Sequence, residues 1–116
     1  MTKTVTAKSP DGKRKMRVPV LAENGPFSVA RCVDLRPGQR KVTKRYCVYH
    51  TKIGAAFKPD FTKKAPAVQA MNMMAEIKGN WDRPFDKLRK DKKLRDKFAE
   101  VLAKIKVEVG DWIAIA

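Results

Sequence analysis

The sequence predicts an α+β fold in which a four-stranded antiparallel β-meander, over residues 1–57, packs against two or three C-terminal helices. Up to about residue 60, short runs of alternating apolar and polar residues are separated by turns rich in Gly and Pro. Beyond that point, apolar residues recur at the three- and four-residue spacing of an amphipathic helix. The chain has 116 residues, which is the length of one domain, and we expect that domain to span residues 1–116.

The four predicted strands are bounded by strong turn signals. Ser9-Pro10-Asp11-Gly12, Asn24-Gly25 and Pro37-Gly38 are all typical of tight turns. The strands cover residues 2–8, 14–21, 27–35 and 41–49. Short strands joined in this way form an antiparallel meander.

The second half predicts two helices and a short final strand. Residues 64–78 carry only a narrow polar stripe, so this helix should be largely buried and should end at Gly79-Asn80. Residues 82–106 predict a second helix whose apolar stripe changes phase near residues 89–91. We expect a bend there, with Asp91 capping the second part of the helix. The weak alternation of residues 107–115 predicts the final strand.

The turn at Pro37-Gly38 sets the register of the third and fourth strands if it closes the hairpin symmetrically. Val33 then faces Val42, and Val29 faces Tyr46. The first face of the hairpin carries the apolar residues Phe27, Val29, Val33, Val42, Tyr46 and Val48. The second face carries Ser28, Ala30, Cys32, Lys41, Thr43, Arg45, Cys47 and Tyr49. We expect the helices on the first face and solvent on the second.

The same register makes two further predictions. Cys32 and Cys47 lie four residues apart on one face, about 13 Å at ~3.3 Å per residue, so both should be free thiols. Arg31 faces Lys44 on the apolar face, where opposed like charges are destabilising. Either that end of the hairpin projects beyond the helices as a basic finger, or an anion lies between the two side chains.

The charge balance is the strongest indication of function. The chain has 27 Lys and Arg against 12 Asp and Glu, a net charge of +15. Residues 1–60 hold 14 basic and 4 acidic side chains, so +10 of the net charge lies in the first half. So basic a domain favours a polyanionic partner, with nucleic acid ahead of an acidic protein and of an anionic membrane.

We expect the binding surface on the open sheet face and the projecting hairpin. Alternation in residues 14–21 turns the basic side chains away from Met16 and Val18. On the same open face, Tyr49 could stack on a base, an interaction of ~1–3 kcal/mol. The candidate nucleic-acid-binding residues are Lys13, Lys15, Arg17, Arg31, Lys41, Lys44, Arg45 and Tyr49. A less favoured surface is the helical cluster of Lys87, Arg89, Lys90, Lys92, Lys93 and Arg95.

The sequence predicts neither catalysis nor a cofactor. His50 is the only histidine, and no cluster of metal-ligating residues surrounds it in the sequence. Neither serine, Ser9 or Ser28, stands in a nucleophile motif, and the glycines form no phosphate-binding loop. The two cysteines lack the spacing of a zinc site. We therefore expect no enzyme, no metal and no cofactor.

The order of four meandering strands followed by a helix resembles the whirly-type and transcriptional-coactivator single-strand binders, over residues 1–80 and at the level of topology. The resemblance implies that a curved antiparallel sheet binds nucleic acid and that a helix mediates a homodimer.

These observations together predict a non-enzymatic protein that binds single-stranded or distorted DNA, such as an accessory protein of a virus or mobile element. Two alternatives stay open: a small effector or inhibitor that docks on an acidic partner surface, and an RNA-binding protein. No apolar run resembles a secretory signal or approaches the roughly 20 residues of a membrane span. We expect a cytoplasmic or host-intracellular protein without a membrane partner.

Overall fold

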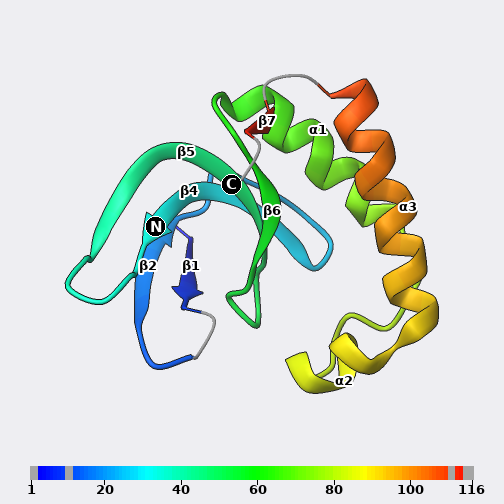
Figure 1. The fold of residues 1–116 in the computed structure, drawn as a ribbon, viewed down its shortest axis with the longest axis horizontal. Coiled ribbons are helices and arrows are strands. Elements are labelled where there is room, and N and C mark those ends of the chain that lie inside the picture. Colours follow the sequence, from blue (N-terminus) through cyan, green and yellow to red (C-terminus); the bar gives the residue numbers. More distant parts are fainter. Residues whose placement is uncertain (1–2, 10–11, 110–111, 114–116) are drawn as a thin grey trace.

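The computed structural model describes residues 3–9, 12–109 and 112–113. Its strands form two antiparallel sheets (Figure 1). The smaller sheet pairs β1 (Thr4–Lys8) with β2 (Lys15–Pro19). The larger sheet contains, in order, β3 (Ala22–Asn24), β4 (Phe27–Asp34), β5 (Lys41–His50), β6 (Ala56–Phe61) and β7 (Trp112–Ile113). The helices are α1 (Lys64–Ala75), α2 (Phe85–Lys90) and α3 (Lys92–Glu108). The predicted α+β class is confirmed, with β3 to β6 as a meander followed by helices.

One face of the larger sheet packs against α1, and α3 lies beyond it (Figure 1). The buried core on this side comprises Phe27, Val29, Val48, Phe61, Ala67, Ala70, Met71, Met74, Ile105 and Val109. Phe27, Val29 and Val48 belong to the face that alternation predicted to meet the helices, whereas Val33 packs against the opposite cluster and Val42 is exposed. Small side chains at Ala67 and Ala70 let α1 lie close to the strands.

Part of the opposite face of the larger sheet is covered, contrary to prediction, whereas Lys41 and Arg45 on this face are exposed as predicted. The β1–β2 sheet packs onto it through Val5, Ala7 and Val18. Beneath these side chains lie Ser28, Ala30, Cys32, Cys47 and Tyr49, all buried. The physical reason is visible in the sequence, because Tyr46-Cys47-Val48-Tyr49 is a continuous apolar run, which is typical of a strand buried on both faces.

The register of β4 and β5 agrees with prediction at the turn and shifts further along. Val33 pairs with Val42, as predicted, whereas Val29 pairs with Val48 and Arg31 with Tyr46. An irregularity between Arg31 and Val33 places three residues of β5 opposite one residue of β4. Beyond this irregularity, the partner of each β4 residue lies two residues further along β5 than predicted.

The predicted break in the last helix is confirmed at Asp91. This residue separates α2 from α3, and its carboxylate accepts a hydrogen bond from the backbone N–H of Leu94 at 3.1 Å. The carboxylate thereby caps α3, since the first N–H groups of a helix have no partner within it.

Other element boundaries differ from those predicted. The predicted second strand, residues 14–21, ends at Pro19 as β2, and neither β3 nor β6 was predicted. Helix α1 ends at Ala75, so Gly79 does not cap it. Gly79 instead lies against α3, where a Cβ atom would come within 2.7 Å of Leu94 Cδ1. In the predicted final strand, β7 covers two residues and pairs with β6.

Among the described residues, no helix combines the length and the apolar character that crossing a bilayer requires.

Candidate nucleic-acid interface

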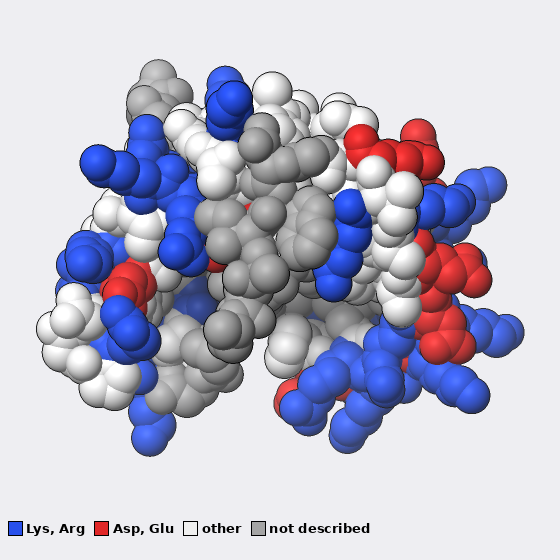
Figure 2. All heavy atoms as spheres, turned by 45° about the horizontal axis from the view of Figure 1, so that its top comes forward, with Lys and Arg blue, Asp and Glu red and all other residues white. Residues whose placement is uncertain are grey.

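The end of the β4–β5 hairpin carries a dense group of basic side chains. Residues 31–45 contain six Lys or Arg residues and one Asp. In Figure 1 this end of the hairpin points away from the helices, and Figure 2 shows Lys and Arg gathered on the same side of the molecule. We call this surface the basic finger; its exposed members are Arg31, Arg36, Arg40, Lys41, Lys44 and Arg45. The hairpin end thus extends away from the helices, which is one of the two alternatives that the sequence left open.

The bulge explains how Arg31 is accommodated. Because of the shifted register, Arg31 lies across from Tyr46 rather than from Lys44. Its guanidinium carbon lies 5.1 Å from the centre of the Tyr46 ring, and Nη2 donates to the Tyr46 hydroxyl at 3.3 Å. This contact replaces the predicted like-charge pair with a cation–π interaction, and no intervening anion is needed.

The acidic residue of the basic finger is neutralised by a neighbour. Arg36 donates to both carboxylate oxygens of Asp34, at 3.0 and 2.8 Å. These hydrogen bonds lower the pKa of Asp34 to about 2. Among the described residues, Arg40, Lys41 and Lys44 form no ion pair with a carboxylate, so their charges are available to an external anion.

The basic residues of β2 lie one layer further out than predicted. Lys13, Lys15 and Arg17 are exposed, whereas Val18 points inward against β4 and β5. The predicted alternation of this strand is confirmed. However, Lys15 and Arg17 belong to the outer face of the smaller sheet and Lys13 precedes β2, so they do not share one sheet face with Lys41 and Arg45.

Tyr49 is unavailable for base stacking, contrary to prediction. Its side chain is 1% exposed, and its hydroxyl donates to the Arg31 carbonyl oxygen at 2.9 Å. Burial and the neighbouring Cys47 raise the pKa of the phenol, which stays neutral. Tyr49 is thus a core residue beneath the β1–β2 sheet.

The alternative surface around α2 and the start of α3 is basic but mixed with carboxylates. Arg83 pairs with Asp91 at 2.8 Å, and Arg89 lies 3.9 Å from Asp86. In Figure 2 the basic side chains at the lower right form a dense group, and most acidic ones lie further up the right-hand side. Residues 83–97 hold eight Lys or Arg and three Asp, so this surface is also strongly basic but has more carboxylates than the basic finger.

A cavity of about 330 Å³ lies between the β5–β6 connection and the helices. Its walls include Phe57, Trp81, Phe85 and Phe98, together with Arg89 and Arg95. The aromatic rings pack edge to face around Trp81, whose ring centre lies 4.9 Å from that of Phe27. Phe85 remains 49% exposed at this cavity.

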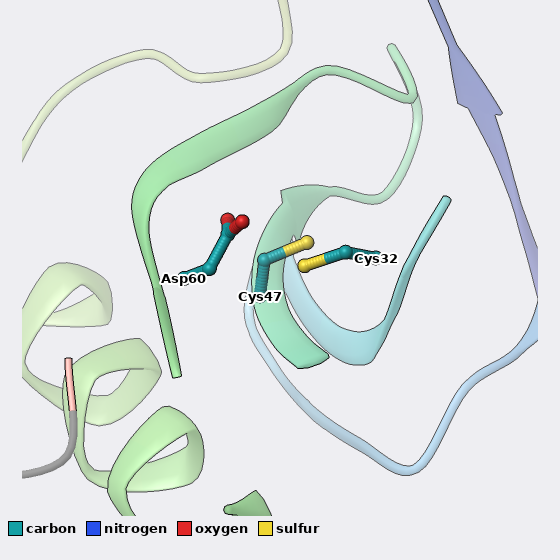
Figure 3. Close-up of side chains that lie close together, drawn as sticks. All are labelled: Cys32, Cys47 and Asp60. Atoms are coloured by element: carbon teal, nitrogen blue, oxygen red, sulfur yellow. The ribbon is translucent and has the colours of Figure 1, made fainter. Parts of the chain in front are cut away.

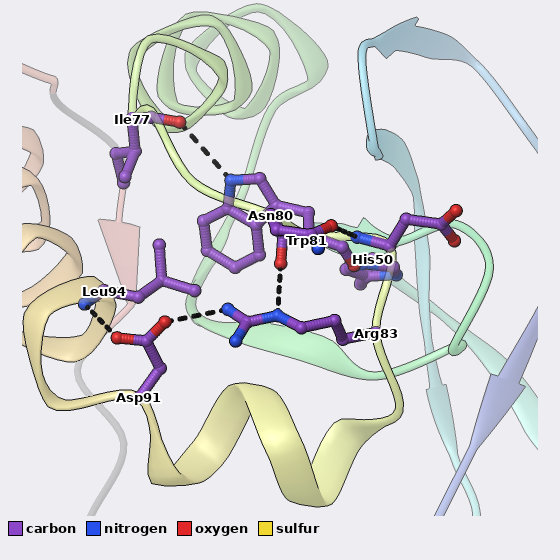
Figure 4. Close-up of polar contacts among 8 residues, drawn as sticks. His50, Ile77, Asn80, Trp81, Arg83, Asp91 and Leu94 are labelled. Atoms are coloured by element: carbon purple, nitrogen blue, oxygen red, sulfur yellow. Dashed lines mark hydrogen bonds and ion pairs between the residues drawn. The ribbon is translucent and has the colours of Figure 1, made fainter.

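His50 joins the sheet to the segment before α2 (Figure 4). Its Nε2 atom lies 2.8 Å from the carbonyl oxygen of Trp81, and the Ile53 N–H donates to Nδ1 at 3.2 Å. Because Nδ1 accepts, the proton of the neutral ring lies on Nε2 and donates to Trp81. The sequence predicted a turn residue here, whereas His50 is a buried bridge at the end of β5.

Cys32, Cys47 and Asp60 lie together beneath the β1–β2 sheet (Figure 3). Their Sγ and carboxylate oxygen atoms are all within 4.8 Å of one another, and all three residues are buried. Both cysteines are free thiols, but the predicted separation of about 13 Å is wrong because the bulge pairs Cys47 with Ala30. A hydrogen bond with Cys47, together with burial, raises the pKa of the Cys32 thiol.

Comparison of the sequence with protein-family models finds no match, and comparisons with curated proteins and with solved structures find no significant similarity.

Proposed function

We propose that this protein binds nucleic acid, and single-stranded or distorted DNA ahead of RNA, through the basic finger. The observation that carries the proposal is the group of six exposed cations at the end of the hairpin. Arg36 pairs with Asp34 and Arg45 lies 4.0 Å from Asp60, whereas Arg40, Lys41 and Lys44 form no ion pair with a described carboxylate. Such a distribution repels itself unless anions lie nearby.

Phosphate contact supplies most of the proposed affinity. Each Lys or Arg that neutralises a phosphate releases counterions, so binding weakens steeply as the salt concentration rises. A two-stranded ribbon is narrow enough to lie in a groove or along a distorted strand. Since Tyr49 is buried, base stacking by that residue contributes nothing, and the proposed binding discriminates little between sequences.

The wider proposal is a non-enzymatic accessory protein, of a virus or mobile element, that acts in the cytoplasm or inside a host cell. The two free thiols are compatible with a reducing compartment. A homodimer remains part of the proposal, although it rests on the topological resemblance alone.

Fluorescence anisotropy tests the proposal with labelled single-stranded DNA, duplex DNA and single-stranded RNA of equal length. We expect saturable binding at low salt, tightest for the single-stranded DNA, with a linear loss of log affinity against log salt concentration. Unlabelled heparin should compete.

Absence of binding to all three nucleic acids at low salt would contradict the proposal and favour an acidic protein partner. Tighter binding to RNA than to DNA would retain the interface and overturn the preference for DNA.

A further inference from the structure

Three consecutive strands of the larger sheet bring two thiols and a carboxylate to one buried point. Cys32 lies on β4, Cys47 on β5 and Asp60 on β6. The β4–β5 bulge places Cys47 diagonally across from Cys32, and a second irregularity, between Tyr46 and Val48, falls at Cys47 in the β5–β6 pairing. Figure 3 shows the three side chains pointing toward one another from these strands.

The distances are close to those that one metal ion requires. Zinc binds sulfur at about 2.3 Å and carboxylate oxygen at about 2.0–2.2 Å, which in a tetrahedral site separates the donor atoms by about 3.5–3.8 Å. The three donor atoms lie within 4.8 Å of one another, so side-chain adjustments of up to about 1 Å close the site.

The charges around the cluster balance with a divalent ion present. Two thiolates and one carboxylate carry three negative charges, and Arg45 Nη1 lies 4.0 Å from Asp60 Oδ2. One divalent cation and the Arg45 guanidinium together supply three positive charges. Counted over these groups alone, the cluster has no net charge with a divalent ion, and equally none with two protonated thiols in its place.

We propose that Cys32, Cys47 and Asp60 form a structural zinc site that joins β4, β5 and β6 at the base of the basic finger. Thiolate sulfur favours zinc over the hard cations magnesium and calcium, and the carboxylate oxygen suits zinc better than copper(I). The second oxygen of Asp60 or a water molecule completes four-coordination. Arg45 supports the carboxylate from outside, as second-shell groups commonly do.

Binding exchanges protons for the metal. The zinc ion forms two Zn–S bonds, each cysteine loses its thiol proton to solvent, and the carboxylate binds without a change of protonation. No electron is transferred. Zinc binds cysteine as thiolate, so two protons are released for each zinc ion bound.

Cobalt(II) titration of the reduced, full-length protein tests this site, which is independent of nucleic-acid binding. We expect saturation at one ion per chain, a thiolate-to-cobalt charge-transfer band, and loss of that band when zinc is added. Cys32→Ser and Cys47→Ser should each abolish the band, and Asp60→Asn should weaken metal affinity at least tenfold. Asp34→Asn, which removes a carboxylate of the same β4–β5 hairpin outside the cluster, should leave metal binding unchanged.

A second measurement on the unmodified protein covers the case in which these buried substitutions prevent folding. Zinc added to weakly buffered protein should release two protons per ion and raise the melting temperature relative to protein treated with a chelator. The proposal is overturned if reduced, folded protein shows neither the charge-transfer band nor proton release. It is equally overturned if Cys32 and Cys47 form a disulfide that persists under thiol reductant.

Discussion

Arg31 and Tyr46 lie directly opposite each other in the β4–β5 ladder, with the guanidinium carbon 5.1 Å from the ring centre. A symmetric hairpin would instead place Arg31 opposite Lys44. The two additional residues of β5 at the bulge therefore remove a like-charge pair and bring Cys47 near Cys32. One local irregularity thus determines both the shape of the basic finger and the cluster beneath it.

The Tyr46 ring should matter more to stability than its hydroxyl. Tyr46→Phe keeps the ring under Arg31 and on the core, so we expect the free energy of unfolding to change by no more than about 0.5 kcal/mol. Tyr46→Ala removes the half-buried ring and should cost about 1–2 kcal/mol. Urea unfolding of the two variants checks the difference, and equal losses would contradict the assigned contact.

Gly54 should tolerate no side chain. Its φ is +83°, and a Cβ atom would lie 2.0 Å from the carbonyl oxygen of Thr6 on β1. Gly54→Ala should therefore displace the β1–β2 sheet. Gly38 has a similar φ of +80°, but no atom lies within 4 Å of the corresponding Cβ position.

Gly38→Ala is thus a matched control that measures backbone strain alone, about 1–2 kcal/mol. We expect a clearly larger loss of unfolding free energy in Gly54→Ala, together with faster amide hydrogen exchange in β1. Equal losses in the two variants would show that β1 does not pack against Gly54.

His50→Ala should destabilise the protein by about 2–5 kcal/mol, because it leaves the Trp81 carbonyl and the Ile53 N–H without their partners. His50→Gln offers one donor and one acceptor and should recover part of the loss. Tryptophan fluorescence during chemical unfolding gives both values. A negligible effect of His50→Ala would contradict the bridging role.

Asp91 should stabilise the fold at neutral pH and lose this effect in acid. Hydrogen bonds from Arg83 and from the Leu94 N–H lower its pKa in the folded protein. A carboxylate whose pKa is lower in the folded than in the unfolded protein stabilises the fold at pH values above its unfolded pKa, near 4. This stabilisation is lost as the pH falls through the folded pKa.

Asp91→Asn should therefore melt below the unmodified protein at pH 7, and the two melting temperatures should converge as the pH falls through the folded pKa of Asp91. Melting curves across this range check the prediction. A difference that is independent of pH would contradict the assigned ionisation.

The parts of the fold that follow local rules could be predicted from the sequence. Alternation placed Val18 inward and Arg17 outward on β2, and the phase change at Asp91 located the break between α2 and α3. Both features depend on residues that lie close together in the chain.

The features that could not be predicted depend on long-range packing. The bulge opposite Cys32 leaves no turn signal in the sequence, so the meeting of Cys32, Cys47 and Asp60 was invisible. The burial of Tyr49 was signalled by the apolar run of residues 46–49, but alternation alone assigned this residue to an open face. Its cover is the β1–β2 sheet, which a single continuous meander does not provide.

The salt dependence of DNA binding by two matched triple variants tests the central proposal most directly. Arg40→Glu/Lys41→Glu/Lys44→Glu reverses three exposed cations of the basic finger, and Lys87→Glu/Lys92→Glu/Lys93→Glu reverses three on α2 and α3. Arg45 is kept because it lies beside Asp60. We predict that the first variant loses most of its affinity for single-stranded DNA and that its slope of log affinity against log salt flattens by about 2 to 3, at ~0.7–0.9 per phosphate contact. The second variant should bind nearly as tightly as the unmodified protein, and loss of binding in the helical variant alone would contradict the assignment of the interface to the basic finger.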